Sequence, residues 1–169
     1  MGVLSMKSIR LLLVTAAVVL ALAPATVLAS TNYREAVSGI ETGYPYNTVD
    51  CQPPNSISPF AGVASGTLDG TFQIAVCHTP LAPNAEIVGG SFVLTSGTTT
   101  VTGQFASGGT VRLVTETVID GSCTQTYSVS GGLLPGGKFS GTLIHYGYWT
   151  GVSCSIFFAT ISGRAQLKV

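Results

Sequence analysis

Residues 155–169 read SIFFATISGRAQLKV, and apolar and polar side chains alternate along them. A spacing of two places the two sets on opposite faces of a β-strand, one dry and one wet. Fifteen residues at about 3.3 Å each would extend roughly 50 Å, which is long for one straight strand, so we predict a bend at Gly163. The apolar set comprises Phe157, Ala159, Ile161, Ala165, Leu167 and Val169.

Short alternating segments, separated by turn residues, fill the chain between residue 65 and this final strand. They indicate about seven strands, and their loops are too short for parallel crossovers, so antiparallel hairpins are expected. No segment of helical length has a period of 3.6 residues. The sequence therefore predicts an all-β domain over residues 65–169, a small antiparallel β-barrel of about seven to eight strands, with a β-sandwich as the alternative.

Alternation also assigns single side chains to the core or to solvent. In the segment 111–119, a period of two places Val111, Leu113 and Ile119 on the core face. Arg112 and Glu116 then form a solvated pair on the opposite face. Gly-x-Phe recurs at residues 70–72, 90–92, 103–105 and 137–139, and we expect each Phe to enter the core.

Residues 30–64 carry a weaker pattern. Pro45, Pro53, Pro54 and Pro59 remove backbone donors and hold the chain in extended or turning shapes. We predict an irregular N-terminal arm over residues 30–64, attached to the β domain.

The first 29 residues have the features of a secretory signal peptide. Lys7 and Arg10 precede an apolar run over residues 11–22, and small or compact residues at 27–29 precede a cleavage point. An uncleaved membrane anchor is the alternative, but a spanning helix needs about 20 apolar residues. We therefore predict export and no membrane span in the mature chain.

The charge of the mature chain excludes some partners. The 140 residues after Ala29 contain five basic and seven acidic side chains, a formal charge of −2. Nucleic-acid binding requires a basic patch that neutralises phosphates, and five scattered cations do not form one.

All four cysteines follow the cleavage point. An even number in an oxidising compartment predicts two disulfides. Three pairings are possible, and we favour Cys51 with Cys77 and Cys123 with Cys154, because the first pair would tie the N-terminal arm to the first strand.

Catalytic and metal motifs are not apparent in the sequence. Ser153 comes nearest to a Gly-x-Ser-x-Gly nucleophile elbow, but the last glycine is missing. Cys77 and His78 are neighbours on a strand and would point to opposite faces, which disfavours one shared zinc ion. Glu116 and Asp120 would lie roughly 13 Å apart on a strand, too far for a glycosidase pair. We predict no catalytic residue, metal or cofactor.

The aromatic cluster at residues 145–149 is the best candidate for a binding site. His145, Tyr146, Tyr148 and Trp149 combine ring faces with polar tips, which suits stacking on a sugar or covering an apolar ligand. The alternative is that these rings only pack the barrel wall. We expect a secreted, non-enzymatic binding module for a small apolar ligand or a glycan. A structural or interaction module of the cell surface and a barrel-cavity enzyme are the alternatives.

Overall fold

A computed structural model describes residues 31–43, 50–81 and 83–169, and their regular structure consists of β-strands. None of this part of the chain forms a helix long and apolar enough to cross a membrane. The predicted signal peptide, residues 1–29, lies outside the described residues. The strands are β1 (Asn32–Glu41), β2 (Ser56–Gly66), β3 (Gly70–His78), β4 (Ala85–Ser96), β5 (Thr99–Phe105), β6 (Gly109–Ile119), β7 (Ser122–Leu134), β8 (Gly137–Trp149) and β9 (Cys154–Lys168).

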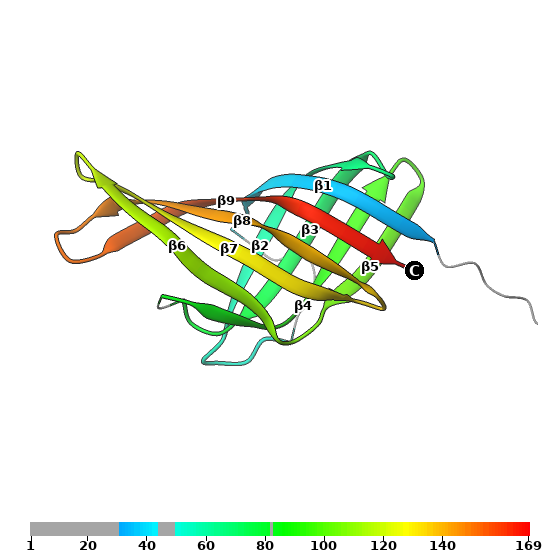
Figure 1. The fold of residues 1–169 in the computed structure, drawn as a ribbon, viewed down its shortest axis with the longest axis horizontal. Coiled ribbons are helices and arrows are strands. Elements are labelled where there is room, and N and C mark those ends of the chain that lie inside the picture. Colours follow the sequence, from blue (N-terminus) through cyan, green and yellow to red (C-terminus); the bar gives the residue numbers. More distant parts are fainter. Residues whose placement is uncertain (1–30, 44–49, 82) are drawn as a thin grey trace, which may run out of the picture.

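These strands form one closed antiparallel barrel (Figure 1). β1 pairs with both β2 and β9, so the first and last strands close the ring. The place between β4 and β7 is shared, because β5 pairs with residues 91–96 of β4 and β6 pairs with residues 85–87. Both β5 and β6 also pair with β7. Nine strands therefore occupy eight positions, and the predicted barrel is confirmed in place of the sandwich.

The two ends of the barrel differ (Figure 1). β1 begins and β9 ends at one of them, which we call the terminal end. At the other, which we call the mouth, the β6–β7 and β8–β9 hairpins project beyond the ring. Asp120 and Gly121 form the β6–β7 turn with φ of 49° and 78°. Two residues with positive φ match the right-handed twist of a tight hairpin, which explains an Asp-Gly pair at this position.

The core confirms the alternation of the final strand. Ile161 and Leu167 are 5% and 4% exposed, and each Phe of the Gly-x-Phe motifs is buried. β9 runs without a break through Gly163, where a Cβ atom would lie 2.5 Å from the carbonyl oxygen of Ser140 and 2.9 Å from Cζ of Phe139. Glycine therefore allows the backbone of the neighbouring strand to approach closely and also leaves room for a phenyl ring.

Two apolar positions of the final strand do not follow the prediction. Phe157 is 62% exposed, because the register between β8 and β9 shifts at Tyr146 and Gly147 and leaves Phe157 without a partner. A bulge of this kind turns the following side chains to the other face. Val169 is exposed because it follows the last residue of β9.

A second bulge overturns the assignment of side chains in β6. The register passes from Leu113 opposite Tyr127 to Thr115 opposite Thr126, so Val114 is the extra residue. Val111 is buried as expected, but the prediction for Ile119 was wrong. The same slip carries Glu116 from the predicted solvent face to the side that faces the mouth.

The irregular arm predicted for residues 30–64 was also wrong, because β1 and most of β2 lie within it. The alternation was hidden because the inward positions of β1 include Glu35 and Gly39. Pro59 is tolerated in β2 because its carbonyl accepts from the N–H of Thr42, just past the end of β1. Proline has no backbone N–H, and the N–H missing at Pro59 would point to the same side as this carbonyl, where β1 has already ended.

Both predicted disulfides are present and no cysteine is free. Cys51 joins Cys77, which ties the segment before β2 to the end of β3. Cys123 joins Cys154 and links β7 to β9 across β8. Two disulfides are typical of extracellular proteins.

Candidate functional site

The barrel mouth holds a pocket of about 470 Å³. One part of its wall is aliphatic and another part carries hydrogen-bonding side chains. The volume falls in the range of small-molecule sites, roughly 300 to 1,000 Å³. Its lining residues are Leu81, Pro83, Leu113, Glu116, Gln125, Tyr127, His145, Cys154 and Ile156.

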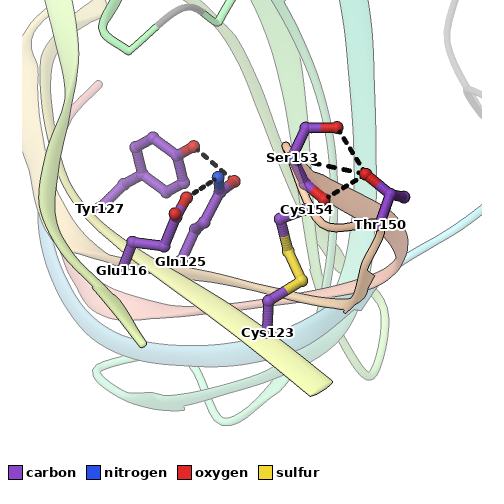
Figure 2. The surroundings of a disulfide bond; sticks show 7 residues. All are labelled: Glu116, Cys123, Gln125, Tyr127, Thr150, Ser153 and Cys154. Atoms are coloured by element: carbon purple, nitrogen blue, oxygen red, sulfur yellow. Dashed lines mark hydrogen bonds between the residues drawn. A yellow bond between two sulfur atoms is a disulfide. The ribbon is translucent and has the colours of Figure 1, made fainter. Parts of the chain in front are cut away.

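A chain of hydrogen bonds crosses the polar wall (Figure 2). The Tyr127 hydroxyl donates to Oε1 of Gln125 at 2.9 Å, and Nε2 of Gln125 donates to Oε2 of Glu116. Tyr127 is buried on β7, whereas the carboxylate of Glu116 on β6 is exposed. Burial, and to a lesser extent the negative charge of Glu116, raises the pKa of Tyr127. The phenol therefore stays protonated at neutral pH, and each hydrogen bond in the series is donated in the direction from Tyr127 to Glu116.

His145 adds a second polar group to the pocket. It lies opposite Gln125 in the β7–β8 register, and its ring centroid is 5.1 Å from that of Tyr127. Burial lowers the pKa of His145, and the proximity of His78 lowers it further. The imidazole is therefore neutral at neutral pH and offers one donor and one acceptor.

His78 is locked in place beside this pocket. Its Nδ1 lies 2.7 Å from the carbonyl of Thr79, and because a carbonyl only accepts, Nδ1 carries the proton. Its Nε2 lies 3.0 Å from the hydroxyl oxygen of Ser58, within hydrogen-bond distance. Burial raises the pKa of Glu41, and His78 partly opposes that effect.

Metal binding has no support in the described part of the chain, where no group of three His, Cys, Asp or Glu side chains is placed to hold an ion. Cys77 is oxidised and His78 is hydrogen-bonded through both nitrogens. Ser153, the nearest sequence match to a nucleophile, bonds to Thr150 in the β8–β9 turn, as Figure 2 shows beside the Cys123–Cys154 disulfide.

The four predicted ligand residues lie in different places. His145 lines the mouth pocket, whereas Tyr146 and Tyr148 lie on the outer face of β8. Trp149 is half-buried at the end of β8, and its backbone N–H donates to the carbonyl of Gly121 at 2.9 Å. The outer rings form two pairs, Tyr146 with Phe158 at 5.8 Å between centroids and Tyr148 stacked on Phe157 at 4.9 Å.

The sequence prediction did not identify the three hydrogen-bonded residues of the polar wall, Glu116, Gln125 and Tyr127, as pocket residues. Alternation along β7 places Gln125 on the same face as Tyr127, so a polar pair on an inward face was a usable signal. Glu116 gave no such signal, because only the bulge at Val114 brings it to the mouth.

Comparisons with models of protein families, with curated proteins and with solved structures found no match for this chain.

Proposed function

We propose that this protein is an exported, non-enzymatic binding domain whose mouth pocket takes one or two sugar units of a glycan. The observation that carries this proposal is the Glu116–Gln125–Tyr127 chain, which borders a pocket of about 470 Å³ together with aliphatic side chains. A sugar ring has hydroxyl groups on its rim and C–H groups on its faces. It therefore needs polar and apolar walls side by side, as this pocket provides.

Hydrogen-bonding capacity favours a neutral, hydroxylated ligand. Glu116 accepts, Gln125 has a second amide proton, and the neutral His145 can donate and accept. These groups match hydroxyls, which are both donors and acceptors. The arrangement supports binding, because each polar group can pair with a ligand without the transfer of a proton.

The filled interior favours this choice over a large apolar ligand. The two inner cavities, of about 40 and 30 Å³, border Ile161 and are lined mainly by aliphatic and aromatic side chains. Volumes of this size hold a few atoms, not a lipid chain.

Export is part of the proposal. It is supported by the two disulfides, which persist in oxidising compartments, and by the signal-like segment at residues 1–29.

The test is a titration of the purified, oxidised protein with mono- and disaccharides, followed by amide NMR shifts and calorimetry. Saturable shifts at Gln125 and His145 are expected for at least one sugar. Gln125→Ala should weaken the binding of that sugar about tenfold, since it removes a hydrogen-bonding group that contributes on the order of 1.4 kcal/mol to the binding free energy. Ser128→Ala, an exposed change on the same strand, is the matched control. No saturable binding, or equal binding by both variants, would contradict the mouth site.

The outer aromatic pair is a second candidate for glycan binding. Tyr148 and Phe157 are 64% and 62% exposed and stack on one another, so they offer a flat apolar surface. Tyr148→Ala tests this surface with the same titration. If that variant abolishes binding while Gln125→Ala leaves it unchanged, the glycan binds outside the barrel.

A further inference from the structure

Four of the five cationic side chains that follow residue 29 gather on the outer face of the barrel, near its terminal end. β1, β9 and β8 lie side by side there (Figure 1). Arg34 of β1 and Lys138 of β8 lie opposite Gln166 of β9 from its two sides, and Arg164 and Lys168 lie two residues before and after it. Directly opposite residues are about 5 Å apart and residues two apart about 6.6 Å, so four cations surround Gln166. We call these four cations the basic ring.

Strand pairing, and not proximity in the sequence, creates the basic ring. Its members are scattered between residues 34 and 168, and they come together because β1 closes the barrel against β9. All four side chains are exposed, and alternation places them on the face opposite to the buried Glu35, Phe139 and Leu167. The patch was therefore hidden in the order of the residues.

No acidic side chain neutralises the basic ring. β8 and β9 contain no Asp or Glu, and the two glutamates of β1, Glu35 and Glu41, belong to its inward set. Within the part of the chain that the structure describes, no hydrogen bond or ion pair joins the four cations to an acidic side chain. Four like charges around one neutral amide repel one another, so a bound anion would relieve this repulsion.

A groove of about 290 Å³ lies between β1 and β9 at the basic ring. Arg34, Arg164 and Gln166 line it, and Ala36, directly opposite Arg164, leaves part of its floor free of a large side chain. A guanidinium group presents parallel N–H donors that match the oxygens of a carboxylate or a similar oxyanion. An anionic group can therefore enter between the two arginines.

The spacing of the cations fits several anionic groups better than one. Arg164 and Lys168 are four residues apart on β9, about 13 Å, and Arg34 and Lys138 are two strands apart, about 10 Å. One small anion cannot contact all four, and each exposed ion pair contributes little by itself. Anionic groups that belong to one chain add their contributions, so the basic ring favours a polyanion.

The outer face continues from the basic ring toward the mouth without an acidic residue. Ser140, Ser162 and Thr142 come first, and the rings of Tyr146 and Phe158 follow, with centroids 5.8 Å apart. Hydroxyl groups and aromatic faces bind the hydroxyl rim and the C–H faces of a sugar ring. This continuation favours a polyanion that is built of sugars.

We propose that this outer face binds an acidic polysaccharide, with its carboxylate or sulfate groups at the basic ring and its sugar rings along β8 and β9. The proposal rests on the export proposed above, but not on the mouth pocket, which lies at the other end of the barrel (Figure 1).

Dextran sulfate, polygalacturonate and unmodified dextran test this proposal on the full oxidised protein. Calorimetry and the side-chain amide signal of Gln166 are the readouts, at one fixed ionic strength. Saturable shifts of Gln166 with at least one acidic polymer, and none with dextran, are expected. The two acidic polymers distinguish sulfate from carboxylate.

Several results would overturn the proposal. They are the absence of a Gln166 shift with both acidic polymers and an equal shift with dextran. Shifts confined to Gln125 and His145 would support the mouth site alone and overturn this one. Tighter binding of phosphatidylglycerol vesicles, or of an oligothymidylate of the same charge, would overturn the assignment to a polysaccharide.

Charge-removing variants locate the binding on the surface. Arg164→Gln should weaken the bound acidic polymer at least threefold, and the double change with Arg34→Gln at least tenfold. Arg112→Gln is the matched control, because it removes the one cation outside the basic ring from an exposed position on β6, and it should weaken binding less than twofold. Equal losses for Arg112→Gln and Arg164→Gln would show an effect of net charge alone and overturn the site.

Gln166→Glu places a carboxylate at the centre of the basic ring. It should weaken the acidic polymer at least tenfold and leave the midpoint of thermal unfolding at or above that of the wild type, because the new carboxylate pairs with the surrounding cations. Unchanged affinity in this variant would contradict the proposal. Gln125→Ala, at the mouth, should leave the affinity for the acidic polymer unchanged, which separates the two sites.

Discussion

Replacing Ile161 by alanine tests the packing of the barrel interior. Ile161 is 5% exposed and borders both inner cavities, the one near Glu35 and the one beneath His78. Truncation to Ala would join these cavities into one void. The core would lose apolar contacts from several strands at once.

The expected loss follows from the carbons that are removed. Three methylene-sized groups at about 0.8 kcal/mol each contribute about 2.4 kcal/mol. The void that they leave, on the order of 80 Å³, adds about 2 kcal/mol at roughly 24 cal/mol per Å³. Part of the Ile161 surface already borders empty space and has fewer contacts to lose. We therefore expect a loss below the sum of about 4.4 kcal/mol and near the middle of the usual range of about 2 to 5 kcal/mol, that is, about 3.5 kcal/mol.

Guanidinium unfolding with the disulfides intact measures this loss. Trp149 fluorescence and far-UV circular dichroism should give one coincident transition. Ile161→Val should cost about 1 kcal/mol. Ser162→Ala, on the outer face of the same strand, should change the stability by no more than about 0.5 kcal/mol. A loss for Ile161→Ala that is no larger than that of Ser162→Ala would refute the inward packing of β9.

Three further changes test other parts of the structure. Replacing both Cys123 and Cys154 by serine removes the disulfide that closes a loop of 31 residues. The chain-entropy relation predicts a loss of about 3.7 kcal/mol in the free energy of unfolding, which calorimetry would measure. An unchanged midpoint of thermal unfolding would contradict this prediction. Burial lowers the pKa of His145 in the folded protein, so as the pH falls through about 6.5 this histidine is protonated first in the unfolded chain. The free energy of unfolding should therefore decrease below about pH 6.5 in the wild type, and decrease less in His145→Gln. Urea midpoints that change with pH by the same amount in both proteins would argue against this. Gly163→Ala should cost about 3 kcal/mol, because its Cβ would lie 2.5 Å from the carbonyl oxygen of Ser140 and 2.8 Å from Cα of Gly141 on the neighbouring strand. Adding Phe139→Leu should recover little of that loss, and recovery of most of it would contradict the backbone contact.

The candidate site was only partly predictable. The aromatic cluster at residues 145–149 led to His145, and alternation could have added Gln125 beside Tyr127. The sequence did not separate the outer Tyr148 from the inner His145 as parts of different surfaces. A Glu on the nominal solvent face of β6 also gave no reason to expect a pocket residue.

Local patterning by itself determined the all-β class and the inward face of most of β9, because a period of two does not depend on which strands become neighbours. The sequence favoured the two disulfide pairs but allowed three pairings, and the tertiary structure selected among them. Only the tertiary structure decided the closure of β1 on β9 and the bulges at Val114 and Phe157. A slip of one residue exchanges the two faces of a strand, and its free energy depends on the partner strand that receives it. Glu116 therefore reached the mouth, and Phe157 reached solvent, through contacts with residues distant in the chain.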